Sequence, residues 1–591
     1  MSLDIARSIA FSGLSSTSVQ ISVTSSNISN ADTTGYTKKT ADQSSSVTNG
    51  VGTGVTVTGI TSTVDKLLLK SLVSADSDLG SADTTNTYLT SLEKLYGSTS
   101  STDSSSTGTS LANSIASLES ALSSLASTPS SASLQSNVVS ALDDVTSQLR
   151  ETSSSIQKLR SNADQDISSS IDDVNTDLQN IADLNAEIKQ TAATGQSTAD
   201  LEDQRNTALQ DVASKMNVSY YTASNGDLQI YTTTGQALVD SSAHKISYTA
   251  AANVSSSTTY TAGSSSSGFS AITVNGVDIT SQISGGDIGA LITLRDKTLP
   301  AAQSQLDQLA TQLASAVNTV SNSASTVPAP TSLTGTSSVT SSTALSATGT
   351  VRLAVTDQSG NLVSYSDLDL SSYSTVGDLV TAINGISGMS ASVDSNGHLS
   401  IAATGSGNGI AINEMTSSVG SSAEGFSDYF GLNDLVTGTS ASDIAVNSSI
   451  LSGTSELQLA TLDSSSTLTA GSSELTSGSA TVVNALYSAL TASRTFSSTG
   501  GLAATTGSFA DYASTIVADV ASKASQASTN YTAKETAQST YASSLSSQSG
   551  VNLDEESANL STLQNQYSAA SALISAINTM YAALITAVQS S

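Results

Sequence analysis

The stretch FSGLSSTSVQISVTSSNISNADTTGYTKKT, residues 11–40, begins as a helical pattern and ends in a loop of unusual composition. The loop, residues 27–39, sets Asn, Asp, Thr and Gly around one tyrosine and closes with two of the chain's 19 basic residues. Gly35 can adopt a backbone conformation that a Cβ atom forbids, and Tyr36 offers a large apolar area with one polar tip. Taken alone, the pattern indicates a helix end and a turn; with the segments described below, we predict a contact surface.

Apolar residues recur at seven-residue spacing at both ends of the chain, which is the pattern of a coiled coil. Near the start, threonines dilute one of the two seams. The seams are Leu14, Ile21 and Ile28, and Leu3, Ala10, Thr17 and Thr24. At the far end the repeat is complete. It comprises Leu560, Tyr567, Ile574, Tyr581 and Val588, then Leu563, Ala570, Ile577 and Leu584. Because Asn552 can cap this last helix, we predict a coiled-coil helix at each terminus.

Long helical patterns lie inside the two ends, and the centre of the chain changes to the period of a strand. Residues 111–125 carry one apolar stripe, and residues 134–188 carry another that predicts a helix roughly 80 Å long. Asn225-Gly226 and Asn275-Gly276 are typical of hairpin turns. The predicted fold class is therefore mainly α with β insertions, made of terminal coiled-coil helices, a long-helix bundle and outer β-rich domains.

These patterns divide the chain into predicted domains. Residues 1–60 and 546–591 form a terminal coiled-coil domain, and residues 61–215, 288–325 and 480–545 form a helical bundle. Residues 216–287 are a β-rich segment, and residues 331–478 are a Ser-, Thr- and Gly-rich outer insert with no recognisable family segment.

The composition excludes several classes of partner. Among 591 residues, 49 acidic residues oppose 19 basic ones, which gives a formal net charge of −30. Nucleic acid and anionic membranes would repel such a surface, so neither is expected as a partner. The chain has no cysteine, which fits export to an oxidising exterior. Asp4 and Arg7 interrupt the first apolar run, so we expect neither a cleavable secretory signal nor a membrane-spanning helix.

No catalytic constellation emerges from the sequence. The two histidines, His244 and His398, lie in Ser-rich β regions, and we interpret them as exposed turn residues without a carboxylate partner. Residues 405–409, GSGNG, are interpreted as a turn because no helix follows to form a phosphate site. We predict that the protein is not an enzyme and has no cofactor and no metal site.

Residues 11–40 resemble the N-terminal signature of the bacterial flagellar rod, hook and hook-associated proteins. That signature is an Ala/Ser-rich helix, a paired-Asn element, and Thr-x-Gly-Tyr/Phe followed by a basic residue. Asn27, Ile28, Asn30, Gly35, Tyr36 and Lys38 stand at the matching positions, while Ser26 replaces the first Asn of the usual pair. Residues 201–221, 283–320 and 549–588 are similar to segments of the hook-associated proteins, which narrows the resemblance beyond a rod or hook protein.

The resemblance implies a structural subunit that joins hook to filament and allows the filament to assemble. It implies partners: further copies of the chain in a ring, the hook protein, a second junction protein, and an export chaperone at the C-terminal helix. Export would follow the flagellar type III route to an extracellular flagellum that serves motility. The predicted assembly interface comprises Leu14, Ile21, Asn27, Ile28, Asn30, Gly35, Tyr36, Leu560, Leu563, Tyr567, Ile574, Ile577, Tyr581 and Leu584.

Three alternatives stay open at this point. Another axial protein, either a hook or a filament-type subunit, shares the N-terminal signature but should lack segments 201–221 and 283–320. A Ser/Thr-rich extracellular adhesin explains the acidity and the β-rich centre, but it explains neither the two heptad patterns nor the loop. An enzyme ranks third.

Overall fold

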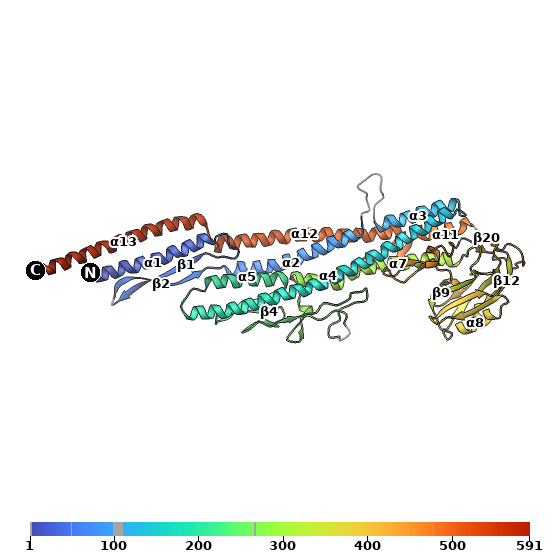
Figure 1. The fold of residues 1–591 in the computed structure, drawn as a ribbon, viewed down its shortest axis with the longest axis horizontal. Coiled ribbons are helices and arrows are strands. Elements are labelled where there is room, and N and C mark those ends of the chain that lie inside the picture. Colours follow the sequence, from blue (N-terminus) through green and yellow to red (C-terminus); the bar gives the residue numbers. More distant parts are fainter. Residues whose placement is uncertain (1–2, 49, 98–109, 265–266, 477, 591) are drawn as a thin grey trace. The chain divides into compact units, whose positions relative to one another are not determined.

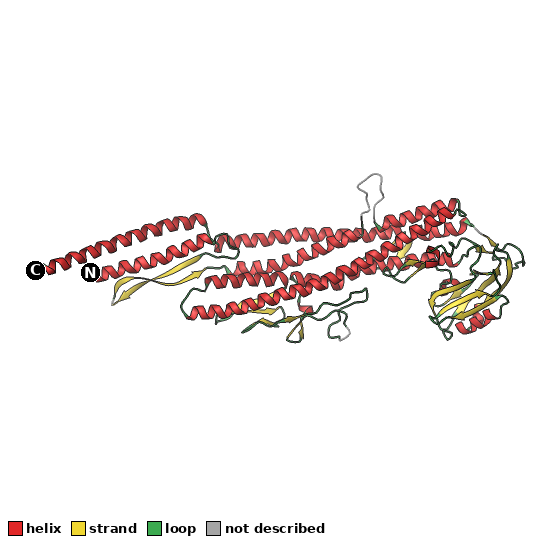
Figure 2. Cartoon of the chain, in the orientation of Figure 1, coloured by secondary structure: helices red, strands yellow, loops and turns green. Residues whose placement is uncertain are grey.

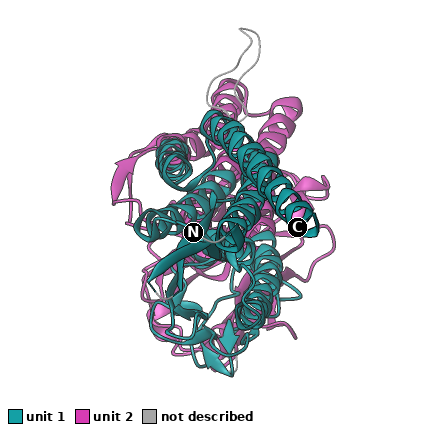
Figure 3. Ribbon diagram, turned by 90° about the vertical axis from the view of Figure 1, so that its left-hand side faces the viewer, with its two compact units in different colours: residues 1–88, 161–296, 525–591 teal, residues 89–160, 297–524 magenta. Residues whose placement is uncertain are grey.

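The computed structural model describes residues 3–48, 50–97, 110–264, 267–476 and 478–590. The chain forms two compact units (Figure 3). Unit 1 combines residues 1–88, 161–296 and 525–591, and unit 2 combines residues 89–160 and 297–524. Long helices dominate, with strands in separate insertions (Figure 2), so the predicted fold class, mainly α with β insertions, is confirmed. The predicted division into domains stays a prediction.

Unit 1 holds both ends of the chain and parts of the longest helices. Its helices are α1 (Leu3–Ser29), α5 (Ala199–Lys215), α6 (Gly286–Thr293), α13 (Leu553–Gln589), and the unit 1 portions of α2 (Lys66–Leu95), α4 (Ala132–Ala193) and α12 (Phe509–Ser549). The predicted long helix is present as α4, which runs unbroken for 62 residues. Its apolar stripe is buried along the whole length, from Val138, 2% exposed, to Ile188, 6% exposed.

A β-hairpin follows the N-terminal loop, in a region that was predicted to be only coiled coil. Strands β1 (Lys39–Thr48) and β2 (Val51–Ser62) pair antiparallel, and both contact α1 (Figure 1). Ser12 on α1 donates to Ile9 O and accepts from Val55 N at 3.2 Å. The hairpin escaped the sequence analysis because β1, KTADQSSSVT, has almost no apolar alternation.

The predicted β-rich segment 216–287 contains two three-stranded sheets. They are β3 (Val218–Thr222), β4 (Leu228–Thr232) and β5 (Ala237–Val239), and β6 (Ile246–Ser247), β7 (Thr273–Val274) and β8 (Val277–Asp278). Both predicted hairpins are present. At the second turn Asn275 and Gly276 have φ of 50° and 78°, as a two-residue type I′ turn requires.

Unit 2 contains a helical part and the β-rich insert. Its helices include α3 (Leu111–Ser127), α7 (Leu299–Asn322) and α11 (Ala480–Thr491). A short hairpin, β21 (Arg494–Phe496) with β22 (Thr505–Gly507), precedes α12. The predicted stripe of α3 is confirmed, since Ile115 and Leu125 are both 0% exposed. Ser110 caps this helix by accepting from Asn113 N.

The insert has an apolar core of its own. Strand β11 (Thr350–Thr356) lies between β12 (Leu362–Asp369) and β15 (Gly409–Asn413), while β14 (His398–Ala403) lies between β13 (Met389–Val393) and β9 (Ser332–Ser338). The core gathers Leu353, Leu379, Ile401 and Phe430, all 0% exposed. Helix α8 (Val376–Asn384) begins with a capping box between Thr375 and Asp378.

The insert is fixed to the end of α7 by buried polar groups. Asn322, 1% exposed, donates through Nδ2 to Asp434 Oδ1 at 2.7 Å, and its Oδ1 accepts from Asn433 N at 2.8 Å. Ser321 Oγ donates to Asn433 O at 2.7 Å. Because these groups satisfy one another away from water, α7 and the insert form one packed body.

Candidate assembly site at the two ends of the chain

Helices α1 and α13 lie side by side in unit 1 (Figure 1). On α13, Leu563 and Ile577 are 5% and 1% exposed. On α1, three of the buried residues belong to the small seam and none to the seam of larger side chains; the other three are Ser16, Val23 and Asn27. The buried members are Ala10, Thr17 and Thr24, whereas Leu14, Ile21 and Ile28 are only half-buried. Helix α1 contacts β1 and β2 as well as α13, and small side chains at such contacts let the neighbouring backbones approach closely.

Asn27 joins the N-terminal loop to the start of α13. Its side chain is 1% exposed and uses its full hydrogen-bonding capacity. Nδ2 donates to Lys39 O at 2.9 Å and to Glu556 Oε2 at 3.0 Å, while Oδ1 accepts from Lys39 N and from Tyr36 OH, both at 3.0 Å. One amide therefore holds together residues that are 529 positions apart.

Ion pairs extend this contact along the first turn of α13. Lys38 Nζ lies 2.8 Å from Glu555 Oε1 and 3.1 Å from Glu556 Oε1, and Lys38 N donates to Ser549 O at 2.8 Å. The hydrogen bond with Glu555 raises the pKa of Lys38, and the same bond lowers the pKa of Glu555. The predicted cap is confirmed, because Asn552 accepts from Asp554 N and Glu555 N. We call the contacts of Asn27 and Lys38 with α13 the terminal lock.

A second set of contacts ties the loop to α5. Asp203, 5% exposed, accepts from Thr37 N at 2.9 Å and from Thr37 Oγ1 at 2.7 Å, and it pairs with Lys39 Nζ. The Lys39 ammonium also lies 4.3 Å from the ring centroid of Tyr36, a favourable cation–π geometry. Burial, followed by the negative charge of Asp200, raises the pKa of Tyr36.

Gly35 has the conformation that the sequence predicted. Its φ is +77°, and a Cβ atom there would lie 2.4 Å from Thr207 Oγ1 on α5. Asn30, by contrast, makes only local side-chain bonds: Nδ2 donates to Ser26 O at 3.0 Å, and Oδ1 accepts from Thr33 Oγ1 at 3.4 Å. Most of the loop residues predicted to contact a second subunit are thus engaged within their own chain.

The apolar residues of α13 divide into two groups. Leu563 and Ile577 are buried, and Leu560, Ile574 and Tyr581 are half-buried. A further set is exposed by 40% to 70%: Tyr567, Leu573, Met580, Leu584, Ile585 and Val588. Tyr581 OH donates to Asp4 Oδ1, near the first described residue of α1, so the residues after Tyr581 extend past the described start of its partner helix.

The sequence analysis expected no helix that could span a membrane, and the last two helices differ from that expectation in length and composition. Within residues 509–589 one window is long and apolar enough to cross a membrane by length and composition, and only 6% of it is buried. No residue from Ser557 onward is charged. A neutral, exposed, apolar surface of this size indicates contact with another molecule.

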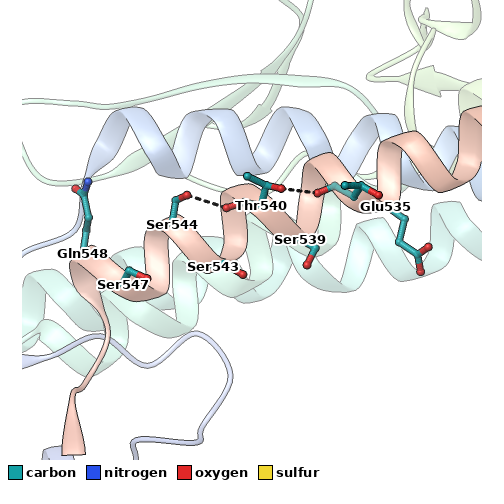
Figure 4. A pocket seen from close by; sticks show the side chains of 8 residues that line it. Glu535, Ser539, Thr540, Ser543, Ser544, Ser547 and Gln548 are labelled. Atoms are coloured by element: carbon teal, nitrogen blue, oxygen red, sulfur yellow. Dashed lines mark hydrogen bonds between the residues drawn. The ribbon is translucent and has the colours of Figure 1, made fainter. Parts of the chain in front are cut away.

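Helix α12 has a different surface. Thr536, Thr540 and Ser544 recur every four residues along one exposed face (Figure 4). Each hydroxyl donates to the carbonyl four residues earlier, as Thr540 does to Thr536 O at 2.8 Å. The face therefore presents hydroxyls that its own helix already satisfies.

A cavity opens beside the N-terminal loop. Its volume is about 350 Å³. Leu69, Leu72, Ala542 and Leu545 give it apolar walls, and loop residues 31–37 and Gln538 line it with polar groups. We call it the loop cavity.

Both histidines have a carboxylate neighbour, contrary to the sequence analysis. His244 Nε2 lies 3.0 Å from Asp240 Oδ2, and His398 Nδ1 lies 3.8 Å from Asp394 Oδ2. The bond to His244 lowers the pKa of Asp240 to about 2. Each pair spans one turn at four-residue spacing, a signal that was visible in the sequence. Among the described residues, no group of three or more His, Asp or Glu side chains is placed to hold a metal ion.

Four family models match segments of this chain. The flagellar hook-associated protein FlgK helical domain matches residues 98–329, and the flagella basal body rod protein matches residues 8–37, which include most of the loop. The C-terminal segment of the flagellar basal body rod FlgEFG protein matches residues 542–587, which include most of α13. Together, the matches to the helical domain and to both ends of the chain support a flagellar hook-associated protein of the FlgK family. The predicted structural role at the hook–filament junction is confirmed with the family.

The fourth match corrects the sequence analysis, which recognised no family segment in the insert. Residues 350–405 match the flagellin hook IN motif. Members of these families are exported flagellar components that assemble with copies of themselves and with other axial proteins, and this chain is one of them.

Comparison with solved structures adds a distant similarity. The flagellar hook junction protein FlgK from Burkholderia pseudomallei is 17% identical, and the alignment covers 80% of this chain and 98% of that one, with a TM-score of 0.45. No curated protein matches the chain.

Proposed function

We propose that this FlgK-family chain builds a ring at the hook–filament junction through the exposed apolar side chains of α13. One observation carries the proposal: α1 covers only part of the apolar surface of α13. Leu584, 54% exposed, continues the seven-residue series of the buried Leu563 and Ile577, and Val588, 70% exposed, continues the series of the half-buried Ile574 and Tyr581. In a ring, the corresponding helix of the next copy would cover them, as in a coiled coil with more than two strands.

A protein partner explains the exposed apolar side chains of α13 better than a lipid bilayer does. The helix carries polar residues among its apolar ones, such as Gln564, Ser575 and Asn578, and a lipid-exposed helix would leave their polar groups without water. A neighbouring helix can accommodate them. The specific partners that we propose are further copies of this chain, the hook protein on one side and a second junction protein on the other.

The exposed apolar side chains of α13 also bear on how the chain is exported. We propose that the chain leaves the cell unfolded through the flagellar type III apparatus and ends extracellularly. A cytoplasmic chaperone that covers the exposed side chains of α13 would prevent them from associating early. The absence of cysteine agrees with this route, because no thiol can become trapped in an oxidised form during transfer.

The test is a charge placed on the exposed part of α13. Leu584→Asp should leave the single chain folded, because Leu584 is 54% exposed. In the ring it would bury an unpaired carboxylate at a cost of several kcal/mol. We expect hooks without filaments, with the variant still exported to the culture medium.

The matched control is Ser575→Asp, which adds the same charge at an exposed polar position of the same helix. It should attach filaments normally. Normal attachment by Leu584→Asp would contradict the proposal, while loss of export would place the defect before assembly.

A further inference from the structure

We propose that the loop cavity receives Phe11 from a second copy of this chain. The inference rests on the proposed function, since it supplies one specific contact of the ring. The cavity has the properties of a receptor for an apolar side chain. Leu69 and Leu72 in its walls are 7% and 4% exposed, and polar groups of the loop surround them. An apolar cavity of about 150 Å³ already holds a benzene ring, so about 350 Å³ accommodates a phenylalanine side chain with room to spare.

Phe11 is the exposed side chain that fits. Within the described part of α1, it is the large apolar residue left most open, at 66%. The other exposed positions that follow it on α1 are serines: Ser15, Ser18, Ser22 and Ser25. A lone aromatic on a serine face contributes nothing to the packing of its own chain and has the character of a binding anchor.

Charge is complementary between the two surfaces. Arg7 is exposed and lies four residues before Phe11, on the same face of α1. Within its own chain its guanidinium lies 5.7 Å from the ring centroid of Tyr581 and has no carboxylate partner among the ion pairs of the described residues. Asp32 lines the loop cavity and is exposed. Basic residues are scarce in this chain, with 19 against 49 acidic ones. The positive charge of Arg7 beside Phe11 and the negative charge of Asp32 at the loop cavity therefore favour this docking over a random approach.

The geometry requires a second copy. Phe11 lies 18 residues before the end of α1 at Ser29, beyond which the loop lines the cavity. At 1.5 Å per residue this separates Phe11 from its own loop by about 27 Å along a rigid helix. A neighbouring copy displaced by about that distance along the helix axis brings its Phe11 to the cavity.

The experiment uses the full chain in assembled flagella. Phe11 is replaced by the photoreactive analogue p-benzoyl-phenylalanine, and two isotopically distinct populations of the chain are mixed before assembly. After irradiation we expect adducts between copies that map to residues 64–72 or 538–551. The same analogue at Ser25, about 21 Å further along the same helix, should give at least tenfold fewer adducts with those residues.

Any other main adduct overturns the inference. An adduct with a hook or filament protein identifies a different occupant, and an adduct elsewhere on this chain identifies a different contact. Irradiation that yields adducts from Ser25 but none from position 11 also overturns it.

A second variant keeps the test decisive if the analogue blocks assembly. Ala542→Phe fills the cavity from within, so it should abolish filament attachment while the chain is exported and its unfolding temperature is kept. Ser547→Phe, on the exposed face of α12, is the control and should attach filaments. If Leu584→Asp fails to attach filaments and Ala542→Phe succeeds, this inference is wrong and the proposed function stands.

Discussion

At the scale of single residues, the terminal lock depends on the shape of one amide. An asparagine offers two donors and two acceptor positions on a short side chain, and Asn27 uses all of them within its own chain. No other side chain of similar volume supplies both kinds of group to Glu556 and to the backbone of Lys39. The asparagine of the family signature therefore has a physical role inside the subunit.

Asn27→Ala should destabilise unit 1 by about 1–3 kcal/mol, because buried partners lose their hydrogen bonds. Asn27→Asp should cost more, since it sets a carboxylate against that of Glu556. Denaturant unfolding of the purified chain measures both changes. Asn30→Ala, at a locally bonded position of the same motif, should stay within about 0.5 kcal/mol. Equal effects at the two positions would contradict the assignment.

Gly35→Ala tests the conformation of the loop. It combines a backbone penalty of about 1–2 kcal/mol for a positive φ with a clash against Thr207 Oγ1. Gly195→Ala carries only the first cost, because its φ is +75° and no atom lies within 4 Å of the added Cβ. We expect the larger loss of unfolding free energy at Gly35. Adding Thr207→Ala should recover the difference but not the whole loss.

At the scale of elements, the ends of the chain are held unequally. The lock buries Asn27 and Glu556, each 1% exposed, whereas most of α13 beyond Leu563 is exposed. Few apolar contacts and many solvent-exposed turns are the features of a segment that opens locally.

Limited proteolysis of the monomeric chain should therefore remove α13 from its C-terminal end before it cuts the loop. We expect a stable fragment whose C-terminus lies shortly after Glu556, identified by intact mass. Asn27→Ala should remove that boundary and allow cleavage in residues 31–37 as well. Early cleavage of the loop in the unchanged chain would show that the lock does not hold in solution.

The helices and strands also show which parts of the fold could be predicted from the sequence. Periodicity is a local signal, and it identified α3 and α4. Local turn chemistry identified both Asn-Gly turns and the conformation of Gly35. Periodicity did not identify the hairpin of β1 and β2, because serine and threonine erased the alternation, nor that Ala10, Thr17 and Thr24 are buried more deeply than Leu14, Ile21 and Ile28. The partners of Asn27 and Asn322 lie far away along the chain, where no period links them.

At the scale of the whole molecule, acidity is the dominant property. The net charge of −30 repels itself, and burial raises the pKa values of several carboxyl groups. Asp177 is raised to about 6, first by burial and then by Asp211 and Asp173. In unit 2, burial raises the pKa of Asp434 and of Glu414.

The raised pKa values of these carboxyl groups predict that the folded chain is more stable in mild acid than at neutral pH. A carboxyl group whose folded pKa is raised binds more protons when folded, so its favourable contribution is complete below the unfolded value near 4 and is lost as the pH rises through the folded value. For Asp177 the window runs from about pH 4 to about 6. The unfolding temperature should be higher at pH 5 than at pH 8.

Asp177→Asn should flatten this dependence and stabilise the chain at pH 8, while the exposed Asp172→Asn serves as the control. Calorimetry across this range measures the change. A higher unfolding temperature at pH 8 than at pH 5 would show that other groups dominate.

The terminal lock also sets an order of events. Asn27 is made 529 residues before Glu556, so its side chain has no Glu556 to bind until that length of further chain has been synthesised. A chain that stops short of residue 556 cannot close the lock, however well its other parts have folded. The lock thus distinguishes a chain that has reached residue 556 from one that has not, by a single contact between two distant residues.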